Sequence, residues 1–409
     1  MKLKSVDEQV VILMHGAEFG DEQIKEMMTR ELRQRLIEAG EEGRPLRVYC
    51  GYDVTAPDIH LGHTITMRKL RQFQEFGHDV TFLIGTFTTL IGDPSDRDDE
   101  RAMPLTELIE KNALTYSEQA FKILDREKTS IRYNNDWLGK LTFADVIRLA
   151  SHFTVQQFLV RDRLRNRYER NEPLWLRELL YPLAQGYDAV HLKADVQIGA
   201  TEQLFNLMAG RKLQEVFGLK PQVCITYPVL VGTDGEMRMS KSIGNYIGVN
   251  EPPEEQYGKV MSLPDNVMLQ YFSLVTRWLP DQIAAIQADL EQDRIHPMEA
   301  KKKLAWEIVD AFNGSGAADT AAAHFEKVHQ SREFPTDMST FALKQSTNIV
   351  DLLVAAGLCR SKGEARRVVQ QGGIKLNGEP VESADTQVEP GEAVLQRGKR
   401  HFVRLTIDL

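Results

Sequence analysis

The pattern of hydrophobic and polar positions predicts an α/β core in the first part of the chain. Residues 46–52 form a short apolar run with β-branched and aromatic members, typical of a strand, and residues 79–85 form another. Between them, apolar residues in 62–76 recur at spacings typical of a helix. A strand, a helix and a second strand in this order indicate a βαβ unit, in which parallel strands are joined by a right-handed crossover.

Most of the remaining chain has helical periodicity. A charged amphipathic segment at 22–40 ends at a glycine, and residues 106–170 and 255–330 are also mainly helical in pattern. Two further strands are predicted at 192–199 and 222–232. Strands that alternate with helices in this way predict an α/β fold with a parallel sheet, followed by an α-helical segment.

The last 63 residues differ in character from the rest. They predict two short helices followed by strands between glycine and proline turns, which indicates a small α+β module. From residue 346 onward there are nine basic and eight acidic residues, whereas the preceding part carries 41 basic and 51 acidic residues. The module is therefore slightly basic on an acidic chain.

Composition limits the class of protein. The chain has 409 residues, 42% of them hydrophobic and 27% charged, as in a soluble globular protein of about two or three domains. A net charge of −9 argues against a general nucleic-acid binder but leaves room for a local basic surface. Three cysteines far apart predict neither disulfides nor a cysteine metal site and favour a cytoplasmic location. The apolar run 10–14 is too short for a membrane span.

Two histidines flank a glycine at the start of the helix in the βαβ unit. They are His60 and His63, with Gly62 between them. Amides at a helix N-terminus and imidazole N–H groups donate hydrogen bonds to phosphate, and glycine allows close approach of the ligand. The motif predicts a polyphosphate site. The alternatives are a surface loop with unrelated histidines and, more weakly, a zinc site, for which no further ligand cluster is evident.

A second motif carries two cations around small hydroxyl side chains. It reads Arg238-Met239-Ser240-Lys241-Ser242 and lies in a glycine-bearing segment, which indicates a flexible loop. Such a loop can close over a triphosphate and follow the charge of a departing pyrophosphate. A solvated basic turn is the alternative interpretation of this motif taken alone.

Together the two motifs resemble the paired signatures of class I aminoacyl-tRNA synthetases. The first reads HLGH, and the second reads RMSKS where the family commonly has KMSKS. The arginine keeps the charge of the first lysine but changes its geometry. No glycine-rich dinucleotide fingerprint follows the first strand, so a nicotinamide-binding enzyme has no support.

The neighbouring segments resemble bacterial tyrosyl-tRNA synthetases over nearly the whole chain. The matching stretches are VYCGYDVTAPDIHLGH, LIGDPS, YPLAQGYD and VQIGATEQLFN, and the last 63 residues resemble the family's small RNA-binding domain, which a ribosomal small-subunit protein shares. The resemblance implies ATP-dependent activation of L-tyrosine to tyrosyl-adenylate, then transfer of tyrosine to the 3′-terminal adenosine of tRNA(Tyr). It implies Mg²⁺ as a companion of ATP, without a dedicated metal site.

The same resemblance divides the chain into functional units. It implies a Rossmann-like catalytic domain over 1–232 with a helical connective insertion at about 106–190, a KMSKS-type loop over 233–250, an α-helical anticodon-side domain over 251–335, a linker over 336–346 and the RNA-binding domain over 347–409.

Selection of tyrosine over phenylalanine requires buried groups that bond the phenol, because leaving them unpaired rejects phenylalanine by roughly 10⁴–10⁵. The resemblance implies that Tyr49 and Asp188 bond the phenol. It also implies that Asp93, Tyr181 and Gln185 bind the ammonium group of the substrate. The full set implied for tyrosine is Tyr49, Gly51, Asp93, Tyr181, Gln185, Asp188 and Gln203.

The resemblance also implies an ATP site around the two motifs. Its residues are Asp53, Thr55, His60, Gly62, His63, Gln197, Glu202, Arg238, Met239, Ser240, Lys241 and Ser242. Those expected to stabilise charge in catalysis are His60, His63, Thr55, Arg238 and Lys241. The ribose segment reads GATEQ where the family commonly has GG(S/T)DQ, so Ala200 and Glu202 each add carbon to a tight site.

Two basic stretches are predicted to bind tRNA. The residues are Arg161, Arg163, Arg165, Arg167, Arg360, Lys362, Arg366, Arg367 and Lys375. Clustered cations suit recognition of folded RNA through its phosphates and shape. For the first stretch a solvated helix end is an equal alternative. The resemblance also makes the connective insertion a dimer interface, so a homodimer is expected.

Two other functions remain open at this point. A tryptophanyl-type paralogue shares the fold and both motifs, although Tyr49 and Asp188 favour a phenol. A synthetase-derived RNA-binding factor without catalysis is the second alternative, because the GATEQ segment departs from the common pattern.

Overall fold

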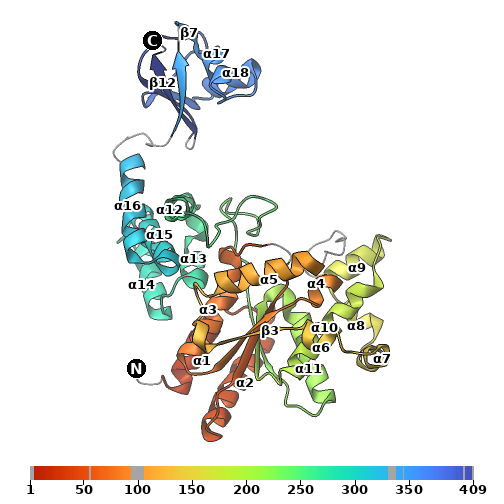
Figure 1. Ribbon diagram of the computed structural model, residues 1–409. Coiled ribbons are helices and arrows are strands. Elements are labelled where there is room, and N and C mark those ends of the chain that lie inside the picture. Colours follow the sequence, from red (N-terminus) through yellow and green to blue (C-terminus); the bar gives the residue numbers. More distant parts are fainter. Residues whose placement is uncertain are drawn as a thin grey trace. The chain divides into compact units, whose positions relative to one another are not determined.

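The computed structural model describes residues 4–54, 57–93, 106–329, 338–343, 345–398 and 401–407. These residues fall into two compact units (Figure 1). Along the chain, the boundary lies between Ala321 and Ala322, within helix α16 (Ser315–His329). Each unit has its own sheet and its own hydrophobic core.

The first unit is built on a five-stranded sheet in which neighbouring strands all run parallel. The strand order is β3-β2-β1-β4-β5. The strands are β1 (Arg47–Tyr52), β2 (Asp79–Ile84), β3 (Thr129–Tyr133), β4 (Val196–Ala200) and β5 (Val223–Tyr227). Val48 of β1 pairs with Val80 on one side and Val196 on the other, so β1 is the central strand. The predicted α/β class and its βαβ unit are confirmed.

Two crossover helices cover opposite faces of this sheet. Helix α3 (Leu61–Glu75) leads from β1 to β2, and α11 (Leu204–Val216) leads from β4 to β5. Buried Leu61, Ile65 and Phe73 give α3 an apolar face, which contacts β1, β2 and β4. Right-handed crossovers that run toward opposite edges place their helices on opposite faces. The direction of winding therefore reverses between β1 and β4.

One strand lies within the segment predicted as a helical insertion. Residues 129–133 form β3 at the sheet edge, reached through α5 (Thr106–Ala120), so this part of the 106–190 prediction is wrong. The first, third and fifth residues of β3 are half-buried, the second and fourth are exposed, and none of the five is fully buried. Such a short edge strand carries little apolar signal. The helices inserted after it are α6 (Asn135–Leu138), α7 (Phe143–Ala150), α8 (Val155–Leu159) and α9 (Asp162–Glu169).

Further helices complete the first unit around the sheet, as Figure 1 shows. They are α1 (Val6–Met14), α2 (Glu22–Glu41), α4 (Thr88–Ile91), α10 (Leu176–His191), α12 (Pro253–Met261), α13 (Met268–Val275), α14 (Pro280–Glu291) and α15 (Pro297–Asn313). The prediction of mainly helical structure over 255–330 is confirmed by helices α12 to α16. No helix of the described residues is long and apolar enough to span a membrane.

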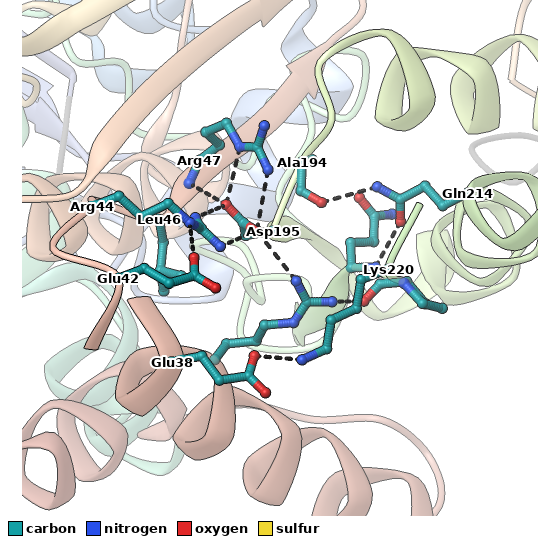
Figure 2. Close-up of polar contacts among 12 residues, drawn as sticks. Glu38, Glu42, Arg44, Leu46, Arg47, Ala194, Asp195, Gln214 and Lys220 are labelled. Atoms are coloured by element: carbon teal, nitrogen blue, oxygen red, sulfur yellow. Dashed lines mark hydrogen bonds and ion pairs between the residues drawn. The ribbon is translucent and has the colours of Figure 1, made fainter. Parts of the chain in front are cut away.

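A buried carboxylate ties α2 to the amino-terminal edge of the sheet (Figure 2). Asp195, just before β4, has a side chain that is 2% exposed and accepts hydrogen bonds from Arg35, Arg44 and Arg47. Burial alone raises the pKa of Asp195, but the bonds from Arg47 and Arg44 outweigh burial and leave the pKa below its ordinary value. The ionised carboxylate therefore joins α2, β1 and β4 at the edge opposite the site described below.

The second unit is a small α+β module. Its main sheet has the order β6-β12-β11-β8-β9, and β7 pairs with β10 in a separate two-stranded sheet. The strands are β6 (Ser339–Leu343), β7 (Thr347–Asn348), β8 (Ile374–Leu376), β9 (Glu379–Pro380), β10 (Gln387–Val388), β11 (Ala393–Arg397) and β12 (His401–Ile407), with helices α17 (Ile349–Ala355) and α18 (Lys362–Gln370). Strand β6 lies in the predicted linker 336–346 and pairs with β12, so the module begins earlier than predicted.

Candidate active site

A cleft lies where the winding of the sheet reverses, at the carboxyl ends of β1 and β4. Open parallel sheets commonly bind ligands at such a point. Two cavities of about 270 and 250 Å³ lie there and share Gly62, His63, Tyr116, Ala200 and Gln203 in their walls. We call the first the outer cavity, because the 238–242 loop lines it, and the second the inner cavity.

The structure brings most of the predicted site residues to these walls. The inner cavity is lined by Gly51, Asp53, Gly62, His63, Asp93, Tyr181, Gln185, Asp188, Gln197 and Gln203. The outer cavity is lined by His60, Gly62, His63, Glu202, Gln203, Arg238, Met239, Ser240, Lys241 and Ser242. Gln197, predicted for ATP, thus lies on the inner side. Thr55 lies outside the described residues.

The base of the inner cavity holds a buried carboxylate. Asp188 of α10 accepts a hydrogen bond of 2.8 Å from the Trp137 indole nitrogen and one of 3.2 Å from the Asn134 amide. Burial raises the pKa of Asp188 to about 8, and those two hydrogen bonds hold it back from rising further. Asp188 can therefore exchange hydrogen bonds with a polar atom of a ligand in the inner cavity.

Tyr49 is buried close to Asp188 but is absent from the lining of the inner cavity. Its ring packs among Leu83, Trp137 and Ala184, and its hydroxyl has no hydrogen-bond partner among the described residues. Burial and then the neighbouring Asp188 raise the pKa of Tyr49 well above its ordinary value. An unpaired buried hydroxyl costs about 1–3 kcal/mol, which a bound polar group could offset.

The side wall of the inner cavity is rich in hydrogen-bond acceptors. Tyr181 donates a hydrogen bond of 3.0 Å to Asp53, which also accepts one of 2.7 Å from Thr88. Gln203 donates to Asp93. The side-chain oxygen of Gln185 is buried and has no partner among the described residues. Two carboxylates and an unpaired amide oxygen form a suitable environment for an ammonium group.

The ribose segment accommodates its alanine without backbone strain. Ala200 has φ −77° and ψ 158°, an extended conformation open to any residue. It is followed by a 3-10 turn (Thr201–Gln203), which carries Glu202 to the outer cavity. The backbone at Ala200 is therefore unstrained, whereas crowding of a ligand by its methyl group stays a prediction.

The two histidines are neutral hydrogen-bond donors. The Nδ1 atom of His60 accepts from the Gly62 amide at 3.1 Å, and Nδ1 of His63 accepts from the His60 amide at 3.3 Å. Burial, then His63 and Lys241, lower the pKa of His60 to about 2. With Nδ1 accepting, the proton of each neutral ring is assigned to Nε2, at the start of α3, where helix amides also favour an anion.

The 238–242 loop is held at its base by Asn245. The Asn245 side chain accepts from the Ser240 amide at 2.8 Å and donates to Asp234 at 2.7 Å. Met239 is 6% exposed, so its side chain belongs to the core. The two cations of the loop instead lie in the wall of the outer cavity. There Lys241 pairs with Asp58, and Arg238 pairs with Glu202.

The arginine stretch of α9 differs from the predicted basic surface. Arg167 is buried and paired with Glu178, and Arg163 pairs with Glu202 beside the outer cavity. Burial lowers the pKa of Arg161, which lies over the Phe205 ring. The prediction of an RNA contact is therefore wrong for Arg167. Of the four arginines predicted here to bind RNA, only Arg165 is an exposed residue, and it pairs with Asp162.

In the second unit, the predicted RNA-binding side chains all lie on the surface. The exposed residues are Arg360, Lys362, Arg366, Arg367 and Lys375. One of them, Lys362, forms an ion pair with Asp351. These side chains are available for contact with RNA phosphates.

Several residues that shape the cleft escaped the sequence analysis. Trp137 and Asn134 hold Asp188, Thr88 holds Asp53, and Tyr116 of α5 packs edge-on against His63. For Trp137 and Asn134, the sequence offered one indication: a tryptophan and two asparagines stand together in the polar stretch after β3. Within the described parts of the chain, no group of three His, Cys, Asp or Glu side chains could hold a metal ion.

Comparison with known proteins identifies the family. A family model for class I tRNA synthetases (W and Y) matches residues 41–330, and a model for the SYY-like C-terminal domain of tyrosine–tRNA ligase matches residues 330–405. The chain therefore belongs to the class I tRNA synthetases of this type.

Individual relatives narrow the family further. The tyrosine–tRNA ligase of Thermotoga maritima is 46% identical over 401 residues, 98% of each chain. That of Geobacter sulfurreducens is 43% identical over 406 residues, 98% of this chain and 99% of its own. The Archaeoglobus fulgidus tyrosyl-tRNA synthetase, solved with L-tyrosine, has the same fold, with a TM-score of 0.61 at 24% identity over 78% of this chain and 100% of that chain. Within its class, the chain groups with the tyrosine–tRNA ligases.

Proposed function

We propose that this chain activates L-tyrosine with ATP and transfers it to tRNA(Tyr). The observation that carries the proposal is a pair of neighbouring buried groups: the Asp188 carboxylate in the wall of the inner cavity, and the Tyr49 hydroxyl, which lies outside that wall but close enough for Asp188 to raise its pKa. The phenol of tyrosine can bond both, whereas phenylalanine leaves them unpaired. The indole of tryptophan offers only an N–H donor and is larger than a phenol, so tyrosine is the better match.

In the first step, a carboxylate oxygen of tyrosine attacks the α-phosphorus of ATP. The bond from this phosphorus to the bridging oxygen breaks, and pyrophosphate leaves. Asp93, Tyr181 and Gln185 hold the ammonium group, and Asp53 fixes Tyr181 through its 3.0 Å hydrogen bond. Neither step needs a nucleophile from the enzyme, so catalysis depends on position and electrostatics.

The outer cavity suits the triphosphate, which enters as its Mg²⁺ complex. His60 and His63 offer Nε2–H donors without charge, while Arg238 and Lys241 supply positive charge from the loop. Such groups stabilise the charge that develops on the β- and γ-phosphates as the bond breaks. Glu202 lies on the same wall and can accept from the ribose hydroxyls.

Transfer of tyrosine to tRNA follows in the same cleft. A hydroxyl of the terminal ribose attacks the mixed anhydride and releases AMP. The exposed cations of the second unit bind the tRNA through phosphates and shape. A location in the cytoplasm is consistent with these substrates and with three cysteines that are all free.

A homodimer is supported by apolar side chains exposed on the helical insertion. Phe143, Ile147, Val160 and Leu176 are 81%, 55%, 70% and 75% exposed. Exposed apolar groups concentrated on one segment favour a protein interface. Sedimentation at micromolar concentration should therefore give the mass of two chains, and a single-chain mass would contradict this part of the proposal.

Aminoacylation of a mixed tRNA preparation tests the whole proposal. Radiolabelled tyrosine should become attached to tRNA(Tyr) in the presence of ATP, and radiolabelled tryptophan should not become attached to any tRNA. Charging with tryptophan would support the paralogue. ATP-independent binding of tRNA without charging would support a factor that has lost catalysis.

A further inference from the structure

The segment that follows the loop carrying Arg238 and Lys241 is anchored beside His60. After the loop, the Leu61 amide donates to the Ile247 carbonyl at 2.9 Å, and the Val249 amide donates to the Ile59 carbonyl at 3.1 Å. These bonds bring the end of the loop segment against the residues around His60. The loop can therefore be fixed or released by a few side-chain contacts made above this base.

The strongest such contact is an ion pair at the mouth of the cavity. The Nζ atom of Lys241 lies 2.6 Å from Oδ2 of Asp58, which comes two residues before His60. The two side chains are 25% and 58% exposed, and both line the outer cavity. Lys241 also lies over the Tyr246 ring, 5.8 Å from its centroid. The lysine is thus oriented by a carboxylate and an aromatic ring.

A carboxylate in this position competes with the triphosphate. Asp58 is negatively charged, as the phosphates are. It forms an ion pair with Lys241, the cation expected to bind them. The second loop cation is arranged similarly, because Arg238 lies 3.5 Å from Glu202, which in turn lies 3.0 Å from Arg163 of α9. Each loop cation is therefore paired with a protein carboxylate.

We propose that Asp58 is a positioning residue that holds Lys241, and with it the 238–242 loop, at the mouth of the outer cavity until the triphosphate displaces it. This inference rests on the proposed use of ATP. On binding, the phosphates replace Asp58 as partners of Lys241, so part of the binding energy is used to break the ion pair. Asp58 therefore keeps the loop ordered in the free enzyme and weakens the affinity for ATP.

The variant Asp58→Asn keeps the size of the side chain and removes its charge. Limited proteolysis with trypsin, without ATP, measures how often the loop opens, and mass spectrometry identifies cleavage after Arg238 and Lys241. Partly exposed ion pairs contribute little, so we expect cleavage about two- to fivefold faster than in the wild type. Asp58→Glu should restore the wild-type rate. Glu118→Gln, which breaks the exposed pair with Arg126 outside the cleft, is the matched control and should cleave as the wild type does.

Equilibrium dialysis with ATP supplies the second measurement. Asp58→Asn should lower the Kd for ATP by about two- to fivefold, and the difference from the wild type should shrink at about 1 M salt, where charges are screened. A side chain that only supports the fold would raise the Kd and give no such dependence on salt. Unchanged cleavage, or a Kd that is unchanged or raised, overturns the proposal.

The proposed function and the proposed role of Asp58 can fail separately. Cleavage without ATP reports the ion pair alone, whatever the enzyme's substrate. If the wild type shows no tyrosine-dependent activity while Asp58→Asn still cleaves faster, the proposed function fails and the ion pair's hold on the loop stands. If activity is present and the cleavage rates are equal, the proposed function stands and the role of Asp58 fails.

Discussion

Trp137 donates a 2.8 Å hydrogen bond from its indole nitrogen to Oδ1 of Asp188, across 51 positions of sequence. This contact joins α6, after the edge strand β3, to α10, which covers the inner cavity. It fixes one carboxylate oxygen, while the Asn134 amide fixes the other. The orientation of Asp188 is thus determined before substrate enters, as selection of a phenol by hydrogen bonding requires.

Asp188→Asn should remove most of the selection for tyrosine. An amide presents a donor where the carboxylate had an acceptor, and that donor meets the Asn134 amide or the phenol. We expect kcat/KM for tyrosine to fall by roughly 10²-fold or more, and the preference over phenylalanine to fall with it. Pyrophosphate exchange measures both values. Asp136→Asn, an exposed residue of α6, is the control and should retain the wild-type values.

His63→Ala and Lys241→Ala should each slow formation of the adenylate. The first removes an Nε2–H donor and the second a positive charge beside the leaving pyrophosphate. Loss of one such donor typically lowers kcat by about 10²–10³-fold. The KM for tyrosine should change little, because neither side chain contacts the base of the inner cavity. Near wild-type exchange rates with unchanged ATP affinity in both variants would refute these assignments.

Lys69 should give the first unit a distinctive dependence of stability on pH. The side chain is 4% exposed, and its amine donates to the Ile12 carbonyl at 3.0 Å. Burial lowers the pKa of Lys69 to about 7. Between pH 7 and 10 the unfolded chain binds more protons at this residue, so stability should rise with pH, by about 2 kcal/mol from pH 7 to 9.

Lys69→Met tests that dependence. Urea unfolding at pH 7 and 9 should show a smaller rise for the variant than for the wild type, by about the same 2 kcal/mol. The methionine side chain is unbranched and only one atom shorter than that of lysine, and it carries no charge. Parallel curves for the two proteins would mean that Lys69 is not the group responsible.

Asp195→Asn should destabilise the first unit without altering substrate selection. The change leaves Arg35, 6% exposed, without its carboxylate partner. Breaking a buried ion pair costs about 3 kcal/mol. Thermal unfolding measures the loss, and Glu42→Gln, which breaks only the outer pair with Arg44, should cost less than about 1 kcal/mol. The KM for tyrosine at low temperature should remain unchanged, because the network lies at the opposite edge of the sheet.

Removal of the second unit should separate the two steps of the reaction. The truncation belongs after residue 329, because β6 pairs with β12 and would be left unpaired by a cut at 347. Adenylate formation should remain within about twofold of the full chain, since the cleft lies wholly in the first unit. Charging of tRNA should fall steeply. Equal losses in both steps would indicate a purely structural module.

Local patterns were sufficient for the parts of the fold made by neighbours in sequence. The βαβ unit and the placement of His60 and His63 at a helix start follow from apolar spacing and motif order. Strand β3 was missed because it is short and lies at an edge. The resemblance supplied the family, which the comparisons confirm, and about half of the residues that line the cleft.

Contacts between distant segments were beyond the reach of these patterns. The roles of Trp137 and Asn134 exist only because α10 packs against α6, far from it in sequence. Arg163 and Arg167 look alike in sequence, yet tertiary packing directs one to Glu202 and the other to Glu178. The sequence also could not show that the backbone at Ala200 is extended and admits a side chain without strain.

ATP–pyrophosphate exchange with each of the twenty amino acids tests the central claim most directly. Asp188 in the wall of the inner cavity and the buried Tyr49 hydroxyl near it predict exchange stimulated by tyrosine alone. Stimulation by tryptophan, or no stimulation by any amino acid, would contradict the account.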